Sequence, residues 1–209
     1  MEGHIYLILP PTANPEGPDL KGTRALRYIK WGEKQGFHKR PSCSGRQRWY
    51  EFPEKKWAKV LWPMIHNDRH GVFWNSHGVA VDHNLFEIHG YDDDLLWGSL
   101  AWTAQILYRE LHGRCNLGQG ALKTEGIDIR TLYVLKTTDY STIQAIRSAR
   151  KAIAHRPIGT VQEETTSSER QALDRVFFDS IGLTKAERAE VYEAVIKLVE
   201  DRLGKAKSL

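Results

Sequence analysis

The chain has 209 residues, of which 41% are hydrophobic and 27% are charged, and its formal net charge is +4 at pH 7. This length fits one domain, or one domain with a helical appendage, and the composition is typical of a globular protein. No apolar run approaches the ~20 residues that a membrane-spanning helix needs. The two isolated cysteines, Cys43 and Cys115, exclude a disulfide framework. We therefore expect a cytoplasmic protein with no membrane partner.

In chain order, residues 4–9 form the first predicted strand, which a Pro-Pro pair ends. A loop rich in proline and glycine follows. From Tyr28 to Ile88, short aromatic or β-branched runs are separated by Gly, Pro and Asn-Asp turns. The best strands in this region are residues 47–52, 58–62, 71–74 and 85–88. This half therefore predicts a small, twisted, mostly antiparallel sheet.

A helix is predicted over residues 95–113, after three aspartates that supply capping oxygens and negative charge at its start. Leucines recur there at helical spacing, and Gly113 is a suitable stop. A further strand is expected over 129–135. Strands followed by a packed helix and another strand indicate an α+β fold.

Beyond Thr137 the sequence is helical. A helix capped by Ser141 is predicted to run to about His155, followed by a polar linker over residues 156–167 and a helix over 169–180. The segment from Thr184 to Glu187 is a capping box that opens a last helix. We therefore predict an α+β domain over residues 1–136 and a helical C-terminal extension over residues 137–209.

Positive charge is concentrated in one part of the chain. Residues 21–60 hold twelve Lys or Arg and only three Glu, so this segment carries +9 and the remainder carries −5. Such an asymmetry favours a polyanionic partner. Aromatic side chains interleaved with the cations, among them Trp31 and Trp49, offer faces on which bases stack. A basic protein-interaction module that binds no nucleic acid is the alternative.

Two segments carry side chains suited to nucleic acid. Arg46 and Arg48 share one face of the predicted strand, and guanidinium forks fit phosphate oxygens and guanine edges. The loop Asn116–Lys123 holds two glycines, two amides that can read adenine, and a lysine that can hold a phosphate. The candidate DNA-binding residues are Lys39, Arg40, Arg46, Gln47, Arg48, Tyr50, Arg69, His70, Asn75, Asn116, Gln119 and Lys123.

Each segment also has a structural interpretation. One arginine could pair with a carboxylate such as Glu33 or Glu51 and hold the fold together. One of Trp49 and Tyr50 is expected to be buried. The glycine loop could serve only to turn the chain.

The order of several motifs is informative. Tyr28-Ile29-Lys30-Trp31-Gly32-Glu33 precedes Arg46–Tyr50, and Phe73–Asn75 and His83–Ile88 come next. The helix, a Gly-x-Gly-Ala-Leu-Lys loop and a strand opened by an aspartate complete the series. Over roughly residues 5 to 203, this order resembles the C-terminal target-recognition region of DNA N6-adenine methyltransferases of the restriction-modification type.

The resemblance implies a part that binds double-stranded DNA and acts with a methyltransferase catalytic domain or subunit. A complete enzyme needs a glycine-rich turn for S-adenosylmethionine and an (Asn/Asp/Ser)-Pro-Pro-aromatic tetrapeptide for the flipped adenine. The only Pro-Pro, Pro10-Pro11, lacks both flanking residues, and the only Gly-x-Gly, Gly118–Gly120, follows a predicted helix. We therefore expect no catalytic or cofactor-binding residue here, and S-adenosylmethionine in the catalytic domain.

A small metal-dependent nuclease is a further alternative, because five histidines fall within 24 residues: His66, His70, His77, His83 and His89. A structural zinc site usually includes closely paired cysteines, and the two cysteines lie far from this group. The segment is also predicted to form strands rather than a compact hairpin and helix. We expect no metal, and we interpret His70, beside Arg69 at a turn, as a donor that faces DNA.

Overall fold

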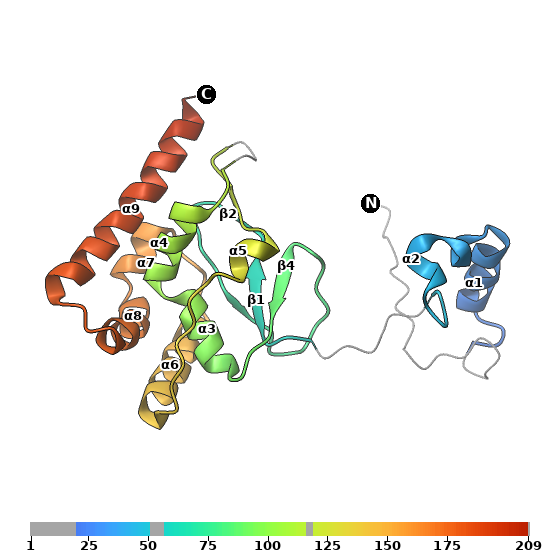
Figure 1. Cartoon of the computed structure of the whole chain (residues 1–209), viewed down its shortest axis with the longest axis horizontal. Coiled ribbons are helices and arrows are strands. Elements are labelled where there is room, and N and C mark those ends of the chain that lie inside the picture. Colours follow the sequence, from blue (N-terminus) through green and yellow to red (C-terminus); the bar gives the residue numbers. More distant parts are fainter. Residues whose placement is uncertain (1–19, 51–56, 116–118, 209) are drawn as a thin grey trace. The chain divides into compact units, whose positions relative to one another are not determined.

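The computed structural model describes residues 20–50, 57–115 and 119–208, and the chain forms two compact units, Met1–Lys56 (unit 1) and Trp57–Leu209 (unit 2) (Figure 1). Helices predominate in the described residues, and small antiparallel sheets accompany them, which confirms the predicted α+β class. The predicted strand over 4–9 lies outside the described residues.

Unit 1 is built around a helix that the sequence patterns did not predict. α1 (Arg24–Lys34) begins where Thr23 Oγ1 accepts the N–H of Leu26 at 3.2 Å. η1 (Phe37–Lys39) and α2 (Pro41–Ser44) follow, and both elements are short. The buried face of α1 packs against Trp49 and Tyr50, which are both half-buried. A Cβ at Gly32 would lie 2.5 Å from Cη2 of Trp49, so only glycine allows this contact.

The predicted strand over 47–52 is wrong for its described part, because residues 47–50 form turns and bends. Trp49 and Tyr50 of this segment pack against α1, and the backbone turns here and is not extended. The alternation that placed Arg46 and Arg48 on one strand face therefore does not exist.

Unit 2 contains a three-stranded antiparallel sheet with β1 (Val60–Pro63) at its centre, between β3 (Phe73–Trp74) and β4 (Leu85–Ile88). Val60 lies opposite Trp74 on one side and Ile88 on the other. β2 (Ile65–His66) pairs antiparallel with β5 (Leu122–Lys123). The three predicted strands around 58–62, 71–74 and 85–88 are thus confirmed in position.

The predicted helix over 95–113 is two helices, α3 (Asp93–Ala101) and α4 (Thr103–His112). Asp92 caps α3 as expected, accepting from Leu95 N–H at 2.9 Å. The chain breaks at Trp102, whose backbone is extended, with ψ of 160°. Asp174, a fully buried residue, accepts hydrogen bonds from both N–H and Oγ1 of Thr103 at 2.7 Å and so caps α4.

The predicted strand over 129–135 is also wrong. Ile129 ends α5 (Gly126–Ile129), and the following segment crosses α3, where Leu135 N–H donates to Ser99 Oγ at 2.9 Å. Leu132 and Leu135 pack against the main core. The apolar side chains that suggested a strand are therefore packed against the main core without forming a strand.

The remaining helices are α6 (Tyr140–Ile153), α7 (Val161–Thr166), α8 (Ser168–Ser180) and α9 (Lys185–Lys207). Asp139, and not Ser141, caps α6, and α7 lies within the predicted linker. The capping box at Thr184 is confirmed.

The helices after residue 137 share one core with the sheet. α6 packs against α3 and α8, and α9 packs against α4. Ile146 and Leu173 join Val60 and Trp62 in the same buried cluster. The predicted boundary at 136/137 therefore lies inside unit 2. In the described part of the chain, no helix is long and apolar enough to cross a membrane.

Candidate nucleic-acid interface

Helix α1 in unit 1 carries four cations on one face. Their spacing of three, three and four residues places them within about a third of the helix circumference. All four are exposed, and we call them the α1 basic face: Arg24, Arg27, Lys30 and Lys34. Residues 20–50 contain nine Lys or Arg residues and one acidic residue, Glu33. This face therefore presents a strong positive potential to solvent.

Two aromatic side chains are exposed on the same helix. Tyr28 is 57% exposed and Trp31 is 47% exposed, and their ring centroids lie 5.4 Å apart. Trp31 and Phe37 are in edge-to-face contact, with ring centroids 5.3 Å apart and planes at 88°. Phe37 in turn contacts Trp49 and lies 4.2 Å from the guanidinium carbon of Arg40. An aromatic series thus connects the surface of α1 to the core of unit 1.

The residues that the sequence predicted in unit 1 lie on the segments after α1. Lys39, Arg40, Arg46 and Gln47 are exposed, whereas Arg48 and Tyr50 are half-buried. Tyr50 packs against the small core, so its ring supports the fold. The exposed members remain candidates for contact with DNA.

The α1 basic face is not among the residues predicted from the sequence. A signal was present, since the four cations follow Thr23, a good N-cap, at helical spacing. Ala25, Ile29 and Gly32 repeat at the complementary positions and are buried. The run of Tyr28, Ile29 and Trp31 has high strand propensity, and that local preference concealed the helical period.

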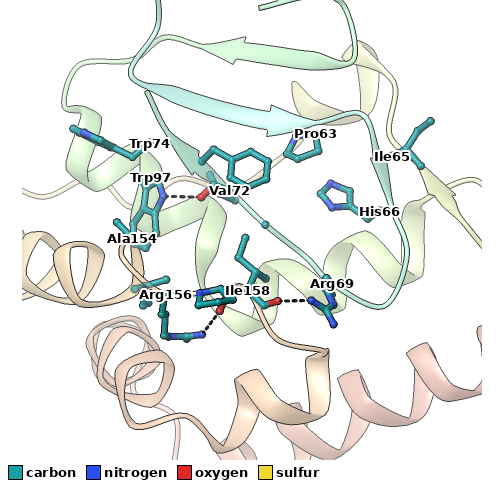
Figure 2. Close-up of a pocket in the computed structure, with 14 residues that line it drawn as sticks. Pro63, Ile65, His66, Arg69, Val72, Trp74, Trp97, Ala154, Arg156 and Ile158 are labelled. Atoms are coloured by element: carbon teal, nitrogen blue, oxygen red, sulfur yellow. Dashed lines mark hydrogen bonds between the residues drawn. The ribbon is translucent and has the colours of Figure 1, made fainter. Parts of the chain in front are cut away.

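In unit 2, Arg69 is exposed as expected and lines a cavity of about 660 Å³ (Figure 2). Its Nη1 donates to the carbonyl of Ile158 at 3.2 Å. Arg156, the other arginine of the lining, pairs with Glu164 at 2.5 and 2.8 Å. Most of the remaining lining is apolar, including Phe73, Trp74 and Trp97.

His70 does not face solvent, which corrects the expectation that it meets DNA. It is 4% exposed and belongs to a buried network. Nη1 of Arg109 lies 3.0 Å from Nδ1 of both His66 and His70. Because a guanidinium only donates, both Nδ1 atoms accept, and Nε2 of His70 lies 3.0 Å from Glu110 Oε1. Burial lowers the pKa of His70 to about 4 despite the adjacent carboxylate, so the ring is neutral.

The same network reaches α9. Both carboxylate oxygens of Glu110 accept from Arg202 at 2.8 Å, and Arg202 also donates to the carbonyls of Asn67 and Gly120. The guanidinium carbon of Arg109 lies 3.7 Å from the ring centroid of Trp62. Burial lowers the pKa of Arg109 to about 9, and the group remains charged at pH 7. These residues hold β2, α4 and α9 together.

Asn75 is likewise structural, because it is 5% exposed. Its side chain donates to the carbonyls of Ala58 and Val79 and accepts from Val79 N–H at 2.9 Å. A residue that closes a turn in this way has no amide group left to read a base edge. The prediction that Asn75 contacts DNA does not fit this geometry.

The predicted glycine loop is described from Gln119 onward, and Asn116 lies outside the described residues. Gln119 is exposed and has a φ of +46°. Gly120 has a φ of +71°, and a Cβ there would lie 3.1 Å from Cβ of Ala206. Lys123 lies on β5, half-buried, with Nζ 2.7 Å from a carboxylate oxygen of Glu125. Gln119 is therefore the better candidate for contact.

The histidines of the nuclease alternative lie in different environments. His66 and His70 are buried, and His77, His83 and His89 are exposed. Across residues 20–50, 57–115 and 119–208, no three His, Cys, Asp or Glu side chains gather as a metal site would require. The described geometry thus gives this alternative no support.

A family model matches residues 4–167, and its description is type II methyltransferase M.Eco57I, C-terminal domain. The chain belongs to this family. The match confirms the resemblance to the C-terminal region of restriction-modification methyltransferases. No curated protein and no solved structure matches the chain.

The range matched to the M.Eco57I C-terminal domain includes the α1 basic face, the sheet and the helices up to α7. α8 and α9 lie beyond it, although they supply Asp174 and Arg202 to the buried contacts of unit 2. This member therefore completes the core of unit 2 with two helices outside the matched range.

Proposed function

We propose that this chain is the DNA-binding, target-recognition part of an S-adenosylmethionine-dependent N6-adenine DNA methyltransferase of a restriction-modification system. Membership of the M.Eco57I C-terminal domain family supports the assignment to a methyltransferase. The α1 basic face carries the proposal for DNA, because its four exposed cations match the charge of a phosphate backbone.

The roles of the side chains follow from their chemistry, and all those proposed for contact are exposed except Arg48 and Lys123, which are half-buried. Phosphate contacts position a protein on DNA, and base contacts specify sequence. The α1 basic face, Lys39 and Arg40 are suited to phosphates. Arg46, Gln47 and Arg48 on the turn segment, and Arg69 and Gln119 in unit 2, have the donors that read base edges. Lys123 is assigned the smallest role, because Glu125 already pairs with it.

Catalysis and cofactor binding are assigned to a partner. In this proposal, a catalytic domain or subunit binds S-adenosylmethionine and holds the flipped adenine, and this chain selects the site. Calorimetry of the full chain with S-adenosylmethionine should then give no saturable heat. Saturable binding would show that cofactor recognition had been placed in the wrong polypeptide.

The direct test is methylation by the intact enzyme that contains this chain. Nucleoside analysis of methylated duplex should give N6-methyladenine, and another modified base would refute the chemistry. Arg46→Ala with Arg48→Ala should reduce methylation by about tenfold or more. A thermal midpoint far below that of the parent would show instead that these arginines hold unit 1 together. Gln119→Ala should relax the choice of one base pair, whereas Lys123→Ala should leave the site unchanged.

A further inference from the structure

The exposed aromatic pair on α1 has no evident use in binding an intact duplex. A duplex presents phosphates and base edges to a protein, whereas base faces are covered by stacking. Tyr28 and Trp31 are about half exposed and lie on the same helix as the α1 basic face. Large aromatic faces surrounded by cations are the arrangement that binds unpaired nucleotides, where rings stack and cations hold the phosphates.

Trp31 is packed against neighbouring rings without any ligand. It makes an edge-to-face contact with Phe37 at 5.3 Å, and Phe37 in turn contacts Trp49 and the guanidinium of Arg40. The ring of Tyr28 lies 5.4 Å from that of Trp31, with the planes tilted by 35°. A ring that is already oriented loses little conformational freedom when a base stacks on it.

We propose that Tyr28 and Trp31 form a stacking platform for an unpaired DNA base whose flanking phosphates contact the α1 basic face. This inference rests on the proposed function for its choice of DNA as the partner and for the source of an unpaired base. An enzyme that turns a base out of the duplex creates unstacked nucleotides at its site, so such a platform has a ligand during the reaction. Charge selects the polyanion, and the aromatic faces select the unpaired base.

The test compares three labelled duplexes of equal length and charge with the full chain. One is fully paired, one has two unpaired thymidines at its centre, and one has two abasic residues there. Stacking on an aromatic side chain changes affinity by roughly 5- to 150-fold per base. The parent chain should bind the thymidine probe about tenfold more tightly than the abasic probe. Equal affinity for these two probes would overturn the platform.

Matched variants locate the effect. Tyr28→Leu with Trp31→Leu should abolish the preference for thymidine and keep affinity for the paired duplex within about twofold, since the cations remain. Arg24→Gln with Arg27→Gln should weaken all three probes about equally and keep the preference. Tyr133→Leu, an exposed tyrosine of unit 2, is the control and should change neither. A preference that survives in the Leu pair would refute the proposal.

Two further variants guard against a loss of folding. Tyr28→Leu alone leaves the contact between Trp31 and Phe37 in place and should lose part of the preference. Trp31→Phe keeps an aromatic face and should retain most of it. The proposed function fails separately: if the parent binds none of the probes at low salt, DNA is not the partner, whereas binding without a base preference refutes only the platform.

Discussion

Exposed cations characterise unit 1, whereas buried ion pairs characterise unit 2. On α1, four cations face solvent. In unit 2, Glu164 accepts from Arg156 and Arg170, and the side chains of Glu164 and Arg170 are each 3% exposed. The carboxylate of Asp94 similarly pairs with Nε of Arg147 and Nε of Arg150, each at 2.7 Å. The buried charges of unit 2 therefore stabilise the fold, and the α1 basic face of unit 1 is open to a ligand.

The two uses of charge have different energetic consequences. Removing one partner of a buried pair leaves an unpaired buried charge, which costs about 3–5 kcal/mol. An exposed cation contributes about 0–1 kcal/mol to folding. Equivalent substitutions should therefore affect stability in unit 2 and binding in unit 1.

The largest expected effect is that of Glu164→Ala. Burial alone would raise the pKa of Glu164, but Arg156 and Arg170 lower it to about 2, so the group is an anion that both arginines need. The substitution should lower the free energy of unfolding by about 3–5 kcal/mol. Glu163→Ala next to it removes an exposed capping contact and should cost only about 1 kcal/mol. Equal losses in urea unfolding would break the comparison.

A smaller effect is expected from acid on the network around His70. Its pKa in the folded state is about 4, below the ordinary value near 6.5, because burial and Arg109 oppose protonation more than Glu110 favours it. The unfolded chain therefore binds the proton first. The stabilisation is complete above pH 6.5 and is lost as the pH falls toward 4.

His70 accounts for a loss of up to about 3 kcal/mol in the free energy of unfolding. Burial and Arg109 also lower the pKa of His66, so His66 acts in the same direction. Unfolding in urea at pH 7 and pH 5 measures it. His70→Asn should be less stable at pH 7 but show a shallower dependence between these values. A chain that is equally stable at both pH values would contradict the assignment of neutral, buried imidazoles.

The smallest effect is expected for stability in unit 1. Arg24→Gln with Arg27→Gln should change the free energy of unfolding by less than about 0.5 kcal/mol, because both side chains are exposed. Thermal melting of the full chain checks this. A large destabilisation would mean that the α1 basic face holds unit 1 together and is not reserved for a ligand.

Local signals in the sequence predicted much of unit 2. Alternating and β-branched runs located β1 and β4, and Asp92 and Thr184 marked two helix starts, because these features depend on neighbouring residues. The break between α3 and α4 could not be predicted in this way. It depends on Asp174, which lies 71 residues from the Thr103 that it caps.

The candidate interface was only partly predictable for the same reason. The concentration of charge located the segment that contains the α1 basic face, but identifying that face required recognising a helix where Tyr28, Ile29 and Trp31 favour a strand. His70 was misplaced because its partners, Arg109 and Glu110, are about 40 residues away in the sequence and meet it only in the fold.

The most direct test of the central claim compares two variants of equal charge. One variant changes the α1 basic face to Gln: Arg24, Arg27, Lys30 and Lys34. The other changes four exposed cations of unit 2 to Gln: Arg130, Lys151, Arg175 and Lys185. Duplex binding by each full chain is measured from low to moderate salt. The α1 variant should bind weakly, with the slope of log affinity against log salt reduced by up to about 3.6, and the unit 2 variant should match the parent. Equal losses in both variants, or a loss only in the unit 2 variant, would contradict a DNA contact through α1.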